Sequence, residues 1–194
     1  MKKAIIILCG LFVTALSFGQ TSSGTWNSTT ATYANTKHGI TWELISELDW
    51  VGRPILTEST LLKVRNDDTR ILVKLLANPY SGKEGDAWSM ISMYESKDYT
   101  DVVKAEAKRN GMTYTGTKVV KSQLCGIHAV KVKSDMTKYY PEHKATVHSI
   151  EYTYVLCKNN NVYTVAITLL SALETDLDDY DRIVTRLFNG FKIK

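Results

Sequence analysis

The pattern of hydrophobic and polar residues first becomes regular at residue 40. Residues 40–44 alternate apolar with polar side chains, which is the period-two pattern of a half-buried strand. Apolar, β-branched runs follow at 60–65 and 69–76. The Asn-Asp-Asp sequence at 66–68 favours a turn between them, because these side chains hydrogen-bond their own backbone. The first predicted unit is therefore a strand followed by a hairpin.

Five further runs have the composition of strands, at 88–94, 117–123, 127–133, 149–157 and 162–170. The first of them follows a loop at 78–86, and the other four form two hairpins. Cys125-Gly126 lies at the turn of one hairpin, and residues 158–161 lie at the turn of the other. Because short turns join neighbouring strands, we expect a largely antiparallel sheet of six to eight strands.

Two ranges carry the 3.6-residue period of amphipathic helices, at about 98–110 and 176–189. Asp98 is the expected N-cap of the first helix, and Gly111 is its expected C-terminal stop. The second helix ends at Gly190, and it is predicted to bury Tyr180, Ile183 or Val184, and Leu187. Both apolar stripes need a sheet to pack on, so the predicted fold class is α+β.

Four stretches share structural motifs with a known family: the aromatic-x-Asn at 33–35, the Gly-apolar strand at 39–44 with Trp50 after it, the Gly-centred hairpin at 124–130, and the helix at 180–191 that closes on Phe-Lys-Ile. In these motifs the chain from residue 33 onwards resembles PsbP-like domains, named for an extrinsic protein of the photosystem oxygen-evolving complex. The resemblance implies an α-β-α sandwich without universal catalytic residues. It also implies a binding or assembly module.

The first residues have the pattern of a cleavable export signal. Lys2 and Lys3 precede an apolar run at 4–16, and Ser17-Phe18-Gly19 leads to a cleavage site before Gln20, with a cut after Ser17 as the alternative. We therefore expect a signal peptide at 1–19, a flexible arm at 20–37 and a single α+β domain at 38–194. The sequence does not distinguish the periplasm from the medium, and no second long apolar run predicts a transmembrane segment.

The composition narrows the possible partners. Of the 194 residues, 44% are hydrophobic, which is enough for a packed core. The formal charge is only +4, and the charged residues are interspersed without a basic block. Nucleic-acid binding is therefore not expected. An unknown protein or small ligand is the predicted partner, and the sequence identifies neither it nor the oligomeric state.

Two cysteines outside the signal, Cys125 and Cys157, are predicted to form a disulfide, since export leads to an oxidising compartment. A register that places Val130 opposite Tyr152 would also place the two cysteines opposite each other. An alternative register, which pairs Lys133 with Glu151, would move the cysteines apart. Two unpaired, buried thiols are the other possible outcome.

No motif in the sequence assigns a reaction, a cofactor or a metal. The acidic residues at 176–181 lack the glycine and the distal glutamate of a calcium loop, and they suit the positive end of a helix. His38, His128, His143 and His148 do not have the spacing of metal ligands. A Gly-x-Ser-x-Gly elbow and a phosphate-binding glycine loop are both absent from the sequence. We therefore expect no Ser, Cys or Asp with a hydrogen-bonded histidine in an open cleft.

The loop at 138–144 is the best candidate for a recognition surface. Tyr139 and Tyr140 are adjacent, with His143 close by, and interfaces favour tyrosine. An ordinary hairpin loop is the alternative. The leading hypothesis is an exported binding or assembly module that is not an enzyme. The rival hypotheses are a hydrolase whose site the sequence does not reveal, and a carrier of a small ligand or metal.

Overall fold

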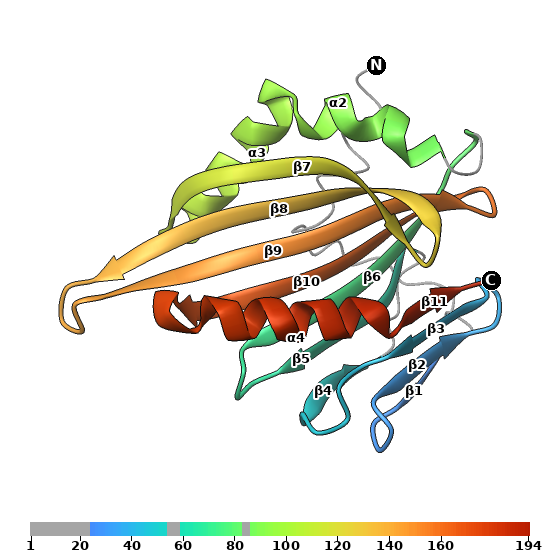
Figure 1. Ribbon diagram of the computed structural model, residues 1–194, viewed down its shortest axis with the longest axis horizontal. Coiled ribbons are helices and arrows are strands. Elements are labelled where there is room, and N and C mark those ends of the chain that lie inside the picture. Colours follow the sequence, from blue (N-terminus) through green and yellow to red (C-terminus); the bar gives the residue numbers. More distant parts are fainter. Residues whose placement is uncertain (1–23, 54–58, 83–85) are drawn as a thin grey trace.

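The computed structural model describes residues 24–53, 59–82 and 86–194. The predicted export signal at 1–19 lies outside the described residues. Within them, two antiparallel sheets form, one of four strands in the order β1-β2-β3-β11 and one of seven in the order β4-β5-β6-β10-β9-β8-β7 (Figure 1). Two sheets thus replace the one predicted from the sequence.

The small sheet contains β1 (Gly24–Asn27), β2 (Thr32–Asn35), β3 (Ile40–Glu43) and β11 (Phe191–Ile193). The predicted flexible arm at 20–37 is wrong for residues 24–35, which pair as β1 and β2. Tyr33 is fully buried, and the Asn35 amide donates a hydrogen bond to its hydroxyl at 2.8 Å. The Ser-, Thr- and Asn-rich composition suggested a linker, but strand pairing here needs few apolar side chains.

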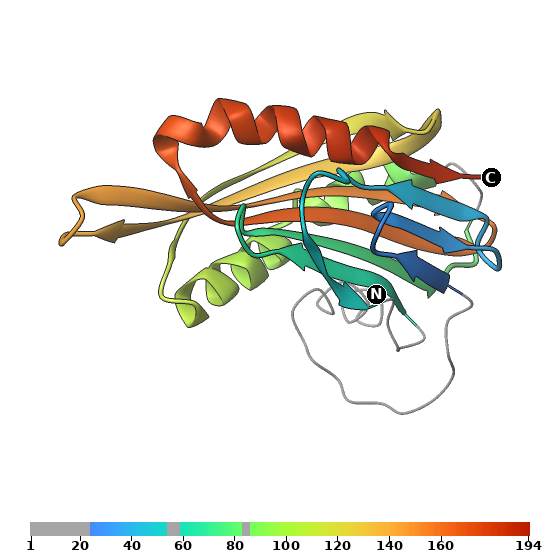
Figure 2. The ribbon, with the colours of Figure 1, turned by 90° about the horizontal axis from the view of Figure 1, so that it is seen from below.

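The large sheet contains β4 (Trp50–Arg53), β5 (Thr60–Asn66), β6 (Ile71–Pro79), β7 (Thr113–Leu124), β8 (Ile127–Tyr140), β9 (Ala145–Lys158) and β10 (Asn161–Leu173). The three predicted hairpins are confirmed. β8 and β9 continue well past their predicted ends, so the predicted long loop is a turn at 141–144 at the tip of a projecting arm (Figures 1 and 2).

The helical elements are η2 (Asp86–Met90), α2 (Ile91–Tyr94), α3 (Lys97–Arg109), η3 (Glu174–Asp176) and α4 (Leu177–Asn189). Figure 2 shows α4 on one face of the large sheet and α3 on the other. This α+β arrangement confirms the predicted fold class. α4 buries Val184, Leu187 and Phe188, while Tyr180 and Ile183 are partly buried against the same core. No helix in the described ranges is long and apolar enough to span a membrane.

The start of α3 differs in detail from the prediction. Ser96 is the N-cap, and its hydroxyl accepts a hydrogen bond from the Tyr99 amide at 3.1 Å. Asp98, the predicted cap, lies in the first turn, where its charge still suits the helix dipole. Gly111 follows the helix with a φ of +65°, as the predicted C-terminal stop requires.

The predicted strand at 88–94 is wrong, because this range belongs to η2 and α2. Ala87 and Tyr94 are buried, and Met90 and Ile91 pack against the same cluster. Positions 90, 91 and 94 lie three, four and seven residues after position 87, which is the spacing of one helix face. In so short an apolar run, helix and strand patterns overlap, and the packing against β8 and β9 selects the helix.

The predicted register between β8 and β9 is also wrong. Val130 lies opposite Val155, and Lys131 lies opposite Tyr154. The prediction assumed that only one face of these strands is buried. Helical elements cover both faces, so Val130 and Tyr152 are both buried but point to opposite sides of the sheet.

This register separates the two cysteines of the predicted disulfide, and both are free in the structure. Cys157 is buried under η2 and α2 in the cluster of Val130. Cys125 lies in the β7–β8 turn, and its Sγ donates a hydrogen bond to the Phe191 carbonyl oxygen at 2.7 Å. The two thiols therefore belong to opposite faces of the large sheet.

We expect iodoacetamide to alkylate Cys125 in the native protein and both Cys125 and Cys157 after denaturation, without any reductant. Burial raises the pKa of both thiols, that of Cys157 to about 11. The thiolate is the reactive form. Alkylation of Cys125 should therefore become faster as the pH rises through and above the ordinary pKa range of a cysteine thiol. Mass spectrometry of the digested protein measures the outcome. Recovery of a linked Cys125–Cys157 peptide would contradict this prediction and restore the disulfide.

Candidate functional site

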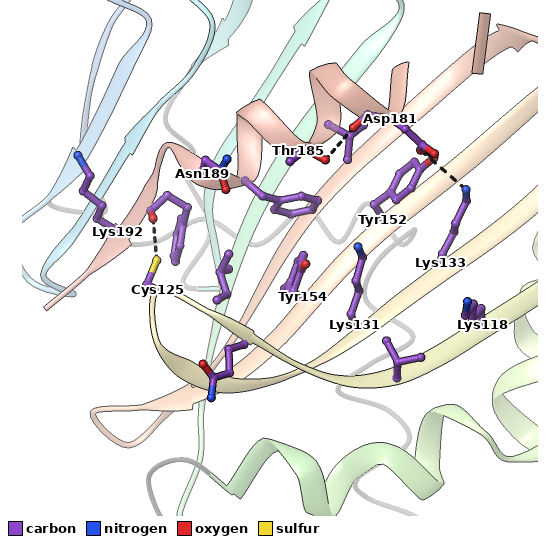
Figure 3. Close-up of a pocket in the computed structure, with 16 residues that line it drawn as sticks. Lys118, Cys125, Lys131, Lys133, Tyr152, Tyr154, Asp181, Thr185, Asn189 and Lys192 are labelled. Carbon is purple, nitrogen blue, oxygen red and sulfur yellow. Dashed lines mark hydrogen bonds and ion pairs between the residues drawn. The ribbon is translucent and has the colours of Figure 1, made fainter. Parts of the chain in front are cut away.

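A cavity of about 730 Å³ lies between α4 and the outer strands of the large sheet, with β11 closing one end (Figure 3). β7, β8 and β9 supply one wall, and α4 supplies the other. Successive turns of α4 place Asp181, Thr185 and Phe188 along the cavity, because residues three and four apart share a helix face. The volume falls within the range of roughly 300–1,000 Å³ that is usual for small-ligand pockets.

On the sheet wall of the cavity, two lysines of β8 lie opposite two tyrosines of β9. The β8–β9 register places Lys131 opposite Tyr154 and Lys133 opposite Tyr152. The Lys131 Nζ lies 5.5 Å from the centre of the Tyr154 ring, and the Lys133 Nζ lies 4.8 Å from that of Tyr152. These are cation–π distances, so the rings orient the ammonium groups without neutralising them.

A third lysine and a single carboxylate complete the polar end of the cavity. Lys118 on β7 lies directly opposite Lys133 on β8. Asp181 accepts a hydrogen bond from the Tyr152 hydroxyl, and its Oδ1 lies 3.9 Å from the Lys133 Nζ. Burial, and then the Asp181 carboxylate, raise the pKa of Tyr152, so its hydroxyl stays protonated and keeps donating.

The other end of the cavity carries apolar side chains together with Gln123 and Asn189. Leu124, Phe188 and Phe191 line it and are buried. The Phe188 ring meets Tyr154 edge to face, with the ring centres 4.7 Å apart. Lys192 lies at this rim, and its Nζ is 3.4 Å from the Glu43 carboxylate. The cavity therefore has a cationic end, an aromatic middle and an apolar end.

Cys125 is the one cysteine among the described residues that line the cavity. No histidine is among the described residues that line it. Cys125 lies at the apolar end, but burial raises its pKa and its proton is used in the bond to Phe191.

The three predicted recognition residues lie far along the β8–β9 arm, and none of them lines the cavity. Tyr139 has 58% of its surface exposed. Tyr140 is half-buried, and the Lys138 Nζ lies 4.8 Å from the centre of its ring. His143 is exposed in the turn. Since Tyr139 and Tyr140 are successive residues of one strand, their side chains point to opposite faces and do not form one patch.

The histidines are not gathered into a metal site. Within the described ranges no group of three His, Cys, Asp or Glu side chains is placed to hold a metal. His38 bonds the Tyr163 hydroxyl, and His128 stacks on Trp88. His148 Nδ1 lies 3.1 Å from the Asp135 carboxylate, a pair that the sequence did not predict. That pair is mostly buried and lies outside the cavity.

Sequence reasoning missed the residues that give the cavity its charge. It paired Glu151 on an outer face with Lys131 in one register and with Lys133 in the other, and it treated Asp181 only as part of an acidic helix start. The available signal was the Lys-Val-Lys alternation at 131–133, beside Tyr-Thr-Tyr at 152–154. Only the correct register brings these two patterns onto one face.

No family model and no curated protein matches the chain. Among solved structures, the chain is similar to the solution structure of cyanobacterial PsbP (CyanoP) from Synechocystis sp. PCC 6803. The TM-score is 0.48 with 10% sequence identity, over 94% of this chain and 99% of the other. The solved structures that the chain resembles thus include a PsbP, as the sequence resemblance predicted.

Two further solved structures are similar. A crystal structure from Bacteroides thetaiotaomicron has a TM-score of 0.44 at 10% identity, over 80% of this chain and 45% of the other, so the chain spans less than half of that protein. LpqN, involved in cell envelope biogenesis of Mycobacterium tuberculosis, has a TM-score of 0.46 at 11% identity, over 80% of this chain and 83% of the other.

Proposed function

We propose that this chain is a non-catalytic binding module that takes one small ligand in the cavity between α4 and strands β7 to β9. The predicted export signal at 1–19 supports a place of action outside the cytoplasm. The observation that carries the proposal is the cavity itself. It combines a ligand-sized volume with aromatic and apolar side chains and with charged and polar groups that include three lysines at one end.

The aromatic lining is well suited to a flat or flexible apolar group. The rings of Tyr152 and Tyr154 line the cavity (Figure 3), and so do Leu124, Phe188 and Phe191. Burial of apolar ligand surface contributes roughly 25 cal/mol per Å² before the costs of association are subtracted. A ligand with an apolar body therefore fits better than a fully polar one.

We expect the purified protein to bind Nile red, a neutral apolar dye, saturably at one site, and decanol to displace it. Val120→Trp should weaken the affinity for the dye at least tenfold, because the half-buried Val120 lies on the cavity wall and an indole would fill the space. Fluorescence titration measures the affinity, and thermal unfolding checks the fold. Unsaturable dye uptake, or equal affinities for wild type and Val120→Trp, would refute the proposed site.

The tip of the β8–β9 arm is the second candidate, as a docking site for a partner protein. It is favoured by the exposure of Tyr139 at the end of a projecting hairpin. The double variant Tyr139→Ser/Tyr140→Ser serves as the matched control in the dye titration. This double variant should bind Nile red like the wild type if the dye occupies the cavity. It should lose the dye if the dye binds at the tip of the arm.

A further inference from the structure

The cationic end of the cavity contains more positive charge than the protein itself neutralises. Lys118 and Lys133 lie directly opposite each other on neighbouring strands, an arrangement of like charges that destabilises a sheet. Lys131 lies two residues from Lys133 on the same face of β8. All three lysine side chains thus line the same wall of the cavity, with Lys131 beside Tyr154 and with Lys118 and Lys133 at the far end (Figure 3).

Asp181, the one carboxylate among the described residues that line the cavity, is already engaged. Asp181 lies 3.9 Å from the Lys133 Nζ and accepts the hydrogen bond from Tyr152. Among the described residues, no carboxylate lies within salt-bridge distance of Lys118 or Lys131. The contact of Lys131 with the Tyr154 ring orients its ammonium group but leaves its charge.

The strand register makes Lys118 and Lys131 near neighbours on the cavity wall. Val120 is the direct partner of Lys131, so Lys118 and Lys131 are diagonal neighbours across β7 and β8. Diagonal neighbours lie roughly 7–8 Å apart at the backbone, a gap that two long side chains can close onto one carboxylate or phosphate. Asp181 stands on the opposite wall and repels an anion from the side of Lys133, which favours the side of Lys118 and Lys131.

We propose that the ligand is an anionic amphiphile whose carboxylate or phosphate group is held by Lys118 and Lys131, with its apolar part extending along α4 toward Phe188 and Phe191. This inference rests on the proposed function, since it assigns the charge of the ligand in the same cavity. The inference goes beyond the proposed function because it predicts a preference for anionic head groups, which an apolar cavity alone would not have.

The test compares compounds that share a ten-carbon chain and differ in the head group: decyl phosphate, decanoate, decanol and decyltrimethylammonium. Each displaces Nile red from the full chain, and inorganic phosphate is titrated separately by calorimetry. We expect both anions to bind at least tenfold more tightly than decanol, and the cation to bind more weakly than decanol, because charge-assisted hydrogen bonds are the stronger ones. Comparison of decanoate with decyl phosphate identifies the preferred anion.

The double variant Lys118→Gln/Lys131→Gln should lose the preference for anions and keep the affinity for decanol. Lys121→Gln is the matched control, because Lys121 lies on the same strand but contacts the Trp88 ring outside the cavity. If the double variant does not fold, the wild type still decides: sodium chloride should reduce the advantage of the anions over decanol, because salt screens charge interactions.

The outcomes separate this inference from the proposed function. Equal affinities for anionic and neutral decyl compounds, or an anion preference that survives in Lys118→Gln/Lys131→Gln, would overturn the inference and leave the binding cavity. Binding of inorganic phosphate as tight as that of decyl phosphate would exclude an amphiphile. Failure of every decyl compound to bind would overturn both.

Discussion

Replacing Trp42 by alanine should lower the free energy of unfolding by about 3–5 kcal/mol, the usual cost of emptying a large buried aromatic site. Trp42 on β3 is fully buried between its neighbouring strand β11 and helix α4. Its indole Nε1 donates a hydrogen bond to the Leu187 carbonyl oxygen at 2.8 Å, and its ring meets Phe191 edge to face at 5.4 Å. One side chain thus joins three elements, and its removal leaves both a void and an unpaired acceptor.

Urea unfolding followed by circular dichroism measures this loss, and Trp42→Phe is the matched control. Phenylalanine keeps most of the ring packing but removes the donor to Leu187, so we expect a smaller loss of about 1–3 kcal/mol. A loss below about 1 kcal/mol for Trp42→Ala would contradict the central position assigned to this residue.

Gly190→Ala should destabilise the protein by about 1–3 kcal/mol, as overpacking usually does. Gly190 joins α4 to β11, and its carbonyl oxygen accepts a hydrogen bond from the Glu43 amide at 3.0 Å. A Cβ added here would overlap the Glu43 carbonyl oxygen, which is backbone and cannot rotate away. The strand junction would have to open, and with it the apolar end of the cavity.

The comparison for this prediction is Gly116→Ala. A Cβ at Gly116 on β7 would meet no atom within 4 Å, so this substitution should change the stability by less than about 0.5 kcal/mol. Denaturant unfolding of both variants under the same conditions provides the measurement. Equal stabilities for Gly190→Ala and the wild type would contradict the structure, because they would show that the junction accommodates a methyl group.

Local patterns were sufficient for elements whose signal lies within a few residues. The apolar stripe of α4 predicted burial of Ile183 or Val184 and of Leu187, and Val184 and Leu187 are buried, because the helical period depends only on the helix. The Asn66 turn and the Gly111 stop were predicted for the same reason, since both depend on the conformational preferences of single residues.

Local patterns failed where another element made the decision. Residues 88–94 contain apolar side chains that satisfy both strand and helix spacing, and contact with the large sheet selected the helix. Tyr33 sits in a polar segment whose burial depends on β3 and β1, which pair with it on either side. In both cases the information lies in residues distant along the chain.

The sequence by itself determined the class of fold, the hairpins and the amphipathic helix that forms one wall of the cavity. The tertiary structure alone decided the register of β8 against β9, and therefore which residues meet in that cavity. The physical reason is that α4 covers one face of these strands and η2 and α2 cover the other. With apolar residues on both faces, the alternation no longer identifies an inner side, and a shift by one residue exchanges the faces. Lys131 and Lys133 join Tyr152 and Tyr154 only in the register that the packing of the whole chain selects.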